Sequence, residues 1–203
     1  MMRGLLVIVA LLVALPLSSV SAAEPDNGLV DNPKYNFWAN FKPGAVAVHS
    51  QKTALTGEEK SDLPDGIDEK VVTYTLLSVS NDKVVVRAVV VEKEFLGTVE
   101  SAPTKITYPA KIKKAHLDAI FQEFGAKVGD KEHTLEVAGK EIKCKLLAGT
   151  HKKGNTVVDF KLYFSDSVPG GVVKRTRKTT QDDKVVAETT ITLTSHKDSS
   201  KKK

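Results

Sequence analysis

The residues of this chain that could do chemistry are few and widely separated. Among its 203 residues are five histidines and one cysteine. No two histidines stand at the spacing of metal ligands, and no cysteine pair accompanies them. We therefore interpret each histidine as a surface residue or one satisfied in the core, and we expect no metal or cofactor. The histidines are His49, His116, His133, His151 and His196.

Cys144 is the one side chain that could serve as a reactive nucleophile, which requires a nearby base and access to solvent. It alternates with Ile142 and Leu146, so we expect it to point inward as a small apolar residue. The chain contains neither a Gly-x-Ser-x-Gly elbow nor a glycine-rich phosphate loop. We assign no catalytic residue and expect a protein that is not an enzyme.

A dense basic segment runs from Lys174 through Arg175, Thr176 and Arg177 to Lys178. In a strand, the two arginines lie on one face and the two lysines on the other. One interpretation is an exposed strand whose lysines prevent edge-to-edge aggregation. The alternative is that all four cations contact an anionic partner, such as a polysaccharide or a lipid head group.

The overall charge argues against nucleic-acid binding. The formal net charge is +5, but Arg3 and the lysines at 201–203 carry four of these charges at the two ends of the chain. A nucleic-acid-binding domain would concentrate its positive charge on one face. The central part of this chain is instead close to neutral, so nucleic acid is not an expected partner.

The first 23 residues have the pattern of a secretory signal peptide. Arg3 is followed by an apolar run from Leu5 to about Leu17 and then by small residues ending in Ala22 and Ala23. Cleavage after either alanine fits the pattern, and the run is short for a membrane anchor, which needs roughly 20 apolar residues. No cysteine stands at the cut to carry a lipid. We expect an exported product, periplasmic or extracellular, soluble and without a lipid anchor or membrane span.

The remaining chain reads as one β-rich domain without an internal disulfide, since it holds a single cysteine. We expect a flexible segment over 24–31, the domain over 32–195 and a disordered basic tail over 196–203. Alternation and turn signals predict about nine strands with short antiparallel connections. A Gly139-Lys140 turn, for example, would join two of them in a hairpin. The expected strands cover residues 45–53, 69–79, 83–94, 104–112, 133–138, 141–148, 156–165, 172–180 and 185–194.

Two helices are expected to cover this sheet. Asn32-Pro33 is typical of a helix start, and the short helix that follows carries a cluster of aromatic residues. It would be a hydrophobic plug or, alternatively, one wall of a ligand pocket. A second helix over 113–124 places apolar residues on one stripe. The fold class is mainly β: a single, strongly curved antiparallel sheet, either a half-barrel or a barrel, with a sandwich as the alternative.

Two segments of the chain carry a family resemblance. One is Asn32-Pro33-x-Tyr35-x-x-Trp38-x-x-Phe41-x-x-Gly44, and the other runs from Ser165-Asp166 through Val168-Pro169-Gly170-Gly171 to Lys174. Together they resemble a poorly characterised family of secreted bacterial β-rich proteins, which implies export and fold but no activity. The order of strands and helices is also similar, in architecture only, to curved-sheet carriers of the lipoprotein-sorting type.

Two non-enzymatic functions are compatible with this pattern. In the first, the concave face of the sheet binds an apolar small molecule, a lipid or a lipid-bearing partner. In the second, a solid-cored structural protein of the cell envelope contacts anionic surfaces through Lys174, Arg175, Arg177 and Lys178. The residues expected to line the ligand site of the first function are Trp38, Phe41, Val86, Leu146, Phe160, Leu162 and Phe164.

Overall fold

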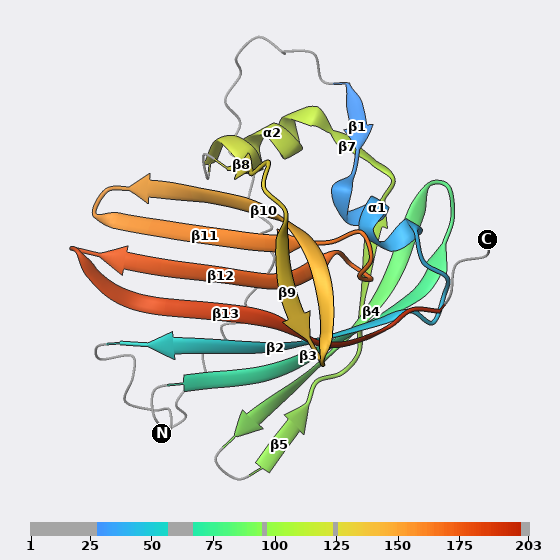
Figure 1. Ribbon diagram of the computed structural model, residues 1–203, viewed down its shortest axis with the longest axis horizontal. Coiled ribbons are helices and arrows are strands. Elements are labelled where there is room, and N and C mark those ends of the chain that lie inside the picture. Colours follow the sequence, from blue (N-terminus) through green and yellow to red (C-terminus); the bar gives the residue numbers. More distant parts are fainter. Residues whose placement is uncertain (1–27, 57–66, 95–96, 124–125, 200–203) are drawn as a thin grey trace, which may run out of the picture.

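The protein is represented by a computed structural model that describes residues 28–56, 67–94, 97–123 and 126–199 (Figure 1). These residues contain thirteen strands and two helices. The helices are α1 (Pro33–Ala39) and α2 (Lys114–Glu123). The strands are β1 (Leu29–Asp31), β2 (Val46–Leu55), β3 (Ile67–Val79), β4 (Lys83–Glu94), β5 (Gly97–Glu100), β6 (Thr104–Pro109), β7 (Lys111–Lys113), β8 (Lys127–Val128), β9 (His133–Val137), β10 (Lys140–Lys153), β11 (Thr156–Phe164), β12 (Val172–Gln181) and β13 (Lys184–Lys197).

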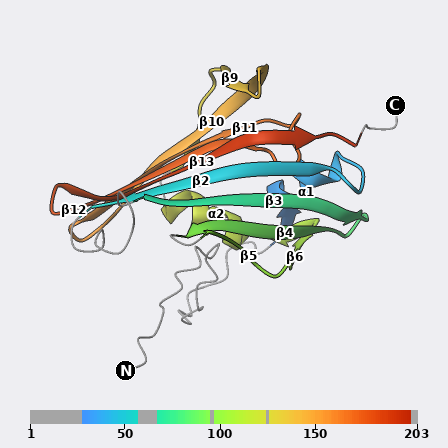
Figure 2. The same ribbon diagram turned by 90° about the horizontal axis from the view of Figure 1, so that it is seen from below.

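Eleven of these strands form one antiparallel sheet. Its order is β5-β4-β3-β2-β13-β12-β11-β10-β8, with β6 also paired to β4 and β9 also paired to β10. The sheet curves strongly but remains open, because the strands at its two ends do not pair with one another (Figure 2). The predicted class, a single curved antiparallel sheet with two helices, is confirmed. Of the half-barrel and the closed barrel that were expected, the open form is the one observed.

Short strands account for the difference between the nine predicted strands and the thirteen observed. β1 pairs with β7 in a separate two-stranded sheet, and β8 adds two residues to the edge of β10. Such segments are too short to show an alternating pattern. The β9–β10 turn is also one residue earlier than predicted: Ala138 and Gly139 both have positive φ, at 49° and 74°, as a two-residue hairpin turn requires.

The two faces of the sheet differ in what covers them. We call the face that packs against α1 the inner face, and the opposite one the outer face. Ala47 on β2, Leu76 on β3 and Val86 on β4 are buried on the inner face, at 0–1% exposure. α1 contacts β3, β4 and β6 on this side. The β9 strand lies on the opposite side of the sheet from α2 (Figure 2).

The start of α1 follows from its sequence. The Asn32 side chain accepts a hydrogen bond from the backbone N–H of Lys34 at 3.1 Å, and Pro33 occupies the first helical turn. This confirms the predicted cap. The Asn32 amide also donates to the Pro109 carbonyl at 2.8 Å, and the Tyr35 hydroxyl donates to the Ser80 carbonyl at 2.8 Å. These two bonds fasten the first turn of α1 to the sheet and to the β3–β4 turn.

The ends of the expected domain need two corrections. Residues 29–31, expected to be flexible, form β1 because their backbone groups find partners in β7. The last strand runs to Lys197, past the expected boundary at 195, because His196 and Lys197 pair with Ala47 and Val46. The predicted signal peptide over 1–23 and the final residues 200–203 lie outside the described residues.

Candidate functional site

One end of the inner face is a packed core. Trp38 and Phe41, from α1 and the residues after it, are 5% and 4% exposed, and Val86 beneath them is fully buried. They pack in one cluster with residues of β2, β3, β4, β12 and β13. These three were expected to line a ligand site, but they fill the core instead, because α1 presses its indole ring into the sheet. The plug interpretation of the helix is the one that the structure supports.

The two segments that carry the family resemblance meet at this packed end. Gly170 donates its N–H to the Phe37 carbonyl at 3.2 Å, and Gly171 packs against the Phe37 ring. Both glycines have positive φ, and a Cβ on either one would come within 2.5–2.8 Å of an aromatic carbon of Phe37 or Trp38. The glycines are therefore required by backbone shape and by close approach together. The resemblance marks a packing joint rather than an active site.

His49 closes the joint from the sheet side. It is 5% exposed, and its Nε2–H donates to the Val172 carbonyl at 2.9 Å. Burial lowers the pKa of His49; the hydrogen bond to Val172 opposes this lowering, and the nearby Arg175 adds a smaller lowering. The ring packs edge-on against Tyr74 at a centroid distance of 5.8 Å. Its Nδ1 is buried and makes no hydrogen bond to any residue that the structure describes. His49 is thus a neutral, buried structural histidine.

The other half of the inner face is not fully packed. Leu162 on β11 lies directly opposite Leu147 on β10, and Arg175 separates it from Ile191 on β13. These three apolar side chains, with Phe160 and Val72 on the same face, are only half-buried. Side chains directly opposite one another in a ladder share a face. They therefore share the part of the inner face that α1 does not cover, which we call the open half, and Arg175 lies between the apolar side chains of β11 and β13.

The remaining expected lining residues divide between the two faces. Phe160 and Leu162 lie on the open half, and Phe164 packs edge-on against Phe37 at 5.7 Å, beside the plug. Leu146 lies opposite Tyr163, which alternates with Leu162, so it belongs to the outer face. The alternation along β10 and its buried side, which carries Ile142 and Cys144 at 5% and 2% exposure, were predicted correctly. That side belongs to the outer face and not to the inner one. The first half of β10 forms a hairpin with β9 that covers the outer face, where His133 stacks edge-on against Tyr163 at 5.4 Å.

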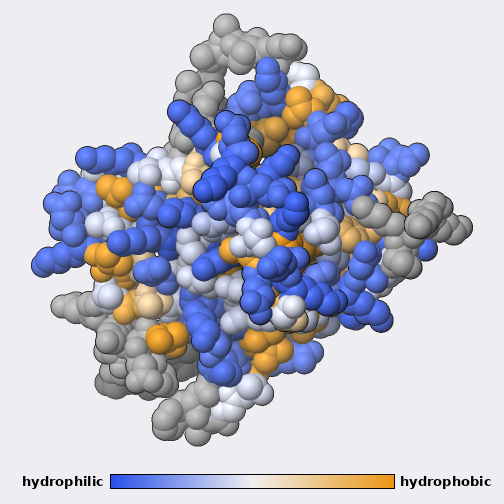
Figure 3. Space-filling model, viewed as in Figure 1, coloured by the Kyte–Doolittle hydropathy of each residue, from blue (hydrophilic) through white to orange (hydrophobic). Residues whose placement is uncertain are grey.

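The basic segment is divided between the faces in the same way. Arg175 and Arg177 lie on the inner face, opposite Leu162 and Phe160 of β11. Lys174 and Lys178 lie on the outer face, opposite Tyr163 and Asp159. The four cations therefore cannot contact one flat surface together. Figure 3 shows the side of the molecule that carries β9, where hydrophilic residues predominate and hydrophobic ones are scattered.

Arg175 stands at the boundary between the packed end and the open half. Its side chain is exposed, yet partial desolvation by the surrounding protein lowers its pKa, with a further lowering from Arg177. Lys34 of α1 approaches from above the sheet: its pKa is also lowered by burial and by Arg175, and its Nζ lies 5.7 Å from the centroid of the Tyr108 ring. The two cations approach one another without a carboxylate between them among the described residues.

Two tyrosines complete this boundary. Tyr74 on β3 interacts with Arg175, and burial raises its pKa. Burial, with a smaller contribution from Tyr74, raises the pKa of Tyr108 on β6 to about 12. Both phenols therefore stay protonated at neutral pH and keep a hydroxyl donor. Neither tyrosine was singled out from the sequence, although Tyr74 alternates with Val72 and Leu76 in a recognisable inward pattern.

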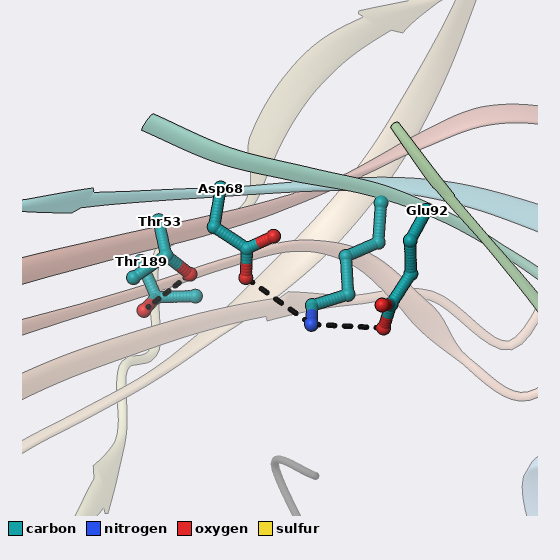
Figure 4. A network of polar contacts seen from close by, with 5 residues as sticks. Thr53, Asp68, Glu92 and Thr189 are labelled. Atoms are coloured by element: carbon teal, nitrogen blue, oxygen red, sulfur yellow. Dashed lines mark hydrogen bonds and ion pairs between the residues drawn. The ribbon is translucent and has the colours of Figure 1, made fainter. Parts of the chain in front are cut away.

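A polar network occupies the far side of the open half (Figure 4). Lys70 on β3 lies 3.0 Å from a Glu92 carboxylate oxygen and 3.2 Å from one of Asp68. Burial acts to lower the pKa of Lys70, but the bonds to these two carboxylates leave it raised. Next to them, the hydroxyls of Thr53 and Thr189 are 3.2 Å apart. Charged residues at inward positions of β3 were not predicted as part of a site, although Lys70 alternates in register with Val72 and Tyr74 on the same face of the strand.

The candidate nucleophile of the chain is Cys144. The Cys144 thiol is 2% exposed, and burial raises its pKa, which disfavours the reactive thiolate. An open depression of about 420 Å³ lies beside it, lined in part by Lys143, Ser165 and Asp166. Within the described ranges, no three histidine, cysteine or acidic side chains come together as a metal site. No described helix is both long and apolar enough to cross a membrane.

Comparisons with known proteins give one solved structure of low similarity. No protein-family model matches the chain, and no curated protein matches it. A crystal structure described as an outer membrane lipoprotein-sorting protein domain from Vibrio parahaemolyticus is similar over 79% of this chain and 87% of that one. The identity is 8% and the TM-score 0.25. At that level the similarity carries no argument, so any functional assignment rests on the residues of this chain.

Proposed function

We propose that this protein is an exported, non-enzymatic binding module that holds the apolar part of a ligand or of a lipid-bearing partner on the open half of its inner face. The observation that carries this proposal is the contrast in burial on one face. Core side chains at the α1 end are 0–5% exposed, whereas Leu162, Ile191, Leu147 and Val72 remain half-buried. Apolar surface exposed inside a curved sheet is stabilised when a ligand removes it from water.

The proposal is tested with a neutral apolar probe. We expect the purified protein to bind a monoacylglycerol, detected by native mass spectrometry and by isothermal titration calorimetry. Leu162→Asn and Ile191→Asn should each weaken this binding by roughly tenfold, since each removes a contact of about 1.5 kcal/mol or more. The matched control is Val157→Asn, a half-buried apolar residue on the outer face of the strand that carries Leu162. Undetectable binding, or equal losses in all three variants, would contradict the proposal.

A second candidate is a solid-cored envelope protein that docks by charge. The position of Lys174 and Lys178 on the outer face, away from the two arginines, supports it. It predicts salt-dependent retention on isolated envelope material, lost in a Lys174→Gln/Lys178→Gln variant, together with protein that is consistently free of ligand. Binding of monoacylglycerol without such retention would favour the first candidate.

Export is part of the proposal and has its own test. The signal-peptide pattern over 1–23 supports cleavage after Ala22 or Ala23. We expect mass spectrometry of protein recovered from outside the cytoplasm to give an N-terminus at Ala23 or Glu24. A product that retains its apolar N-terminus in the membrane fraction would contradict it.

A further inference from the structure

The open half of the inner face changes chemically from strand to strand. Following the ladder pairs from β10 to β3, the residues run Leu147, Leu162, Arg175, Ile191, Gln51 and Lys70. The neighbouring row of inward residues, two positions away on each strand, is Gly149, Phe160, Arg177, Thr189, Thr53 and Asp68. The order is thus apolar on β10 and β11, cationic on β12, mostly neutral hydrogen-bonding groups on β13 and β2, and charged again on β3.

No carboxylate of the described residues neutralises the positive charge on β12. Neither Arg175 nor Arg177 forms an ion pair with any carboxylate among the described residues, and neither does Lys34. The acidic side chains Asp68 and Glu92 on this face are both engaged by Lys70, which lies on β3, three strands away from β12. Cations that are partly desolvated and repel one another are destabilising unless an anion joins them. No described residue provides that anion, so the two arginines can accept one from a ligand.

We propose that the open half recognises an anionic phospholipid, with its phosphate on Arg175 and Arg177 and its acyl chain on the apolar side chains of β10 and β11. This assignment rests on the proposed function, because it names the ligand class of the same surface. The hydroxyls of Thr53 and Thr189 and the Gln51 amide then face a hydroxylated head group beyond the phosphate. Lys34 and Tyr74 provide further donors on the α1 side.

Geometry favours a phosphate diester over a fatty-acid carboxylate. Arg175 and Arg177 are two residues apart on one strand, a separation of about 7 Å along the chain. Two guanidinium forks at that spacing converge on an acceptor with several oxygens, as phosphate has, while a carboxylate is satisfied by one fork. Beyond the phosphate, the head group must extend toward the neutral hydrogen-bonding groups of β13 and β2. A fatty acid ends at its carboxylate and has no atoms to place against these groups.

The test compares single-chain lipids of equal chain length on the purified protein by isothermal titration calorimetry. Lysophosphatidylglycerol should bind at least about tenfold more tightly than monoacylglycerol, given the strength of charge-assisted hydrogen bonds. It should also bind more tightly than the fatty acid, and inorganic phosphate alone should bind weakly. An Arg175→Gln/Arg177→Gln variant should lose the preference, so that its affinities for lysophosphatidylglycerol and monoacylglycerol become similar.

The same strand provides a matched control. Lys174→Gln/Lys178→Gln removes the same charge from the outer face, and we expect it to retain the preference. If it loses the preference equally, the attraction is a general effect of net charge and the inference is overturned. Equal affinities for lysophosphatidylglycerol and monoacylglycerol would overturn the phosphate site and leave the proposed function standing. Tighter binding of the fatty acid would assign a carboxylate instead, and failure of every lipid to bind would overturn both proposals.

Discussion

The two halves of the inner face share several strands but differ in packing: one is a filled core, and the other carries charged and half-buried side chains. At the α1 end, Trp38 and the loop at Gly170 and Gly171 fill the space above the sheet, and the side chains beneath them are almost completely buried. A few residues farther along the same strands, the inward positions carry Arg175, Lys70 and half-buried apolar side chains. A strand therefore passes from core to candidate site without any change in secondary structure.

The difference arises from the elements that lie above each half. A helix fastened by Asn32 and Tyr35 can be packed tightly, because its position is fixed by directional hydrogen bonds. α2 makes few contacts with the large sheet and lies mainly against β7. We infer that stability is concentrated at the packed end, which leaves the open half free to carry polar groups. Substitutions that separate stability from binding test this division.

The largest effect is expected at the plug. Trp38→Ala should lower the free energy of unfolding by about 3–5 kcal/mol, because it removes a fully buried indole and leaves a cavity. The matched change in the open half, Leu162→Ala, should cost only about 1–2 kcal/mol, since that side chain is half-buried. Urea denaturation followed by far-UV circular dichroism measures both. Equal losses would show that the open half is as tightly packed as the plug.

Gly171→Ala probes the same joint from the loop side. The new Cβ would meet the Phe37 ring at 2.5 Å, at a residue whose φ is already 75°. We expect a loss of about 2–4 kcal/mol, combining backbone strain with overpacking. Gly139→Ala is the control, because its φ is 74° and nothing lies within 4 Å of the added atom. It should cost only about 1 kcal/mol, and a cost as large as that of Gly171→Ala would exclude the contact with Phe37 as the cause.

The sequence predicted the local pattern well and the tertiary assignment less well. The bounds of β4, Lys83–Glu94, and the cap at Asn32 agree with prediction, because alternation and capping are set by neighbouring residues. The expected place of Leu146 on the inner face was mispredicted, since it depends on the side of the sheet to which the β9 hairpin folds. The meeting of Lys34 with Arg175 could not be predicted, because it joins a helix to a strand far away in the chain.

Lys70 tests whether the far side of the open half is stabilised by charge pairing. Lys70→Met should lower the free energy of unfolding by about 1–2 kcal/mol, because it leaves Asp68 and Glu92 without their shared partner. Lys143→Met removes the exposed pair with Glu132 and should change stability by less than about 0.5 kcal/mol. Thermal unfolding at low and high salt measures both. If the two variants behave alike, the Lys70 network is no more than a surface ion pair.

The smallest expected effect is a pH dependence at the packed end. The folded-state pKa of His49 lies below its unfolded value of about 6.5, so the unfolded chain binds this proton more readily. The contribution of His49 to stability is complete above that pH and is lost as the pH falls below it, with a slope of at most about 1.4 kcal/mol per pH unit.

His49→Gln should flatten this slope, while its side-chain N–H can still donate to the Val172 carbonyl. His116→Gln, at an exposed helix position, is the control for exchanging a histidine for glutamine. Urea denaturation between pH 5 and 7.5 measures the slopes. If wild type and His49→Gln have equal slopes, His49 becomes protonated without unfolding, and the packed end must then open locally to admit the charge.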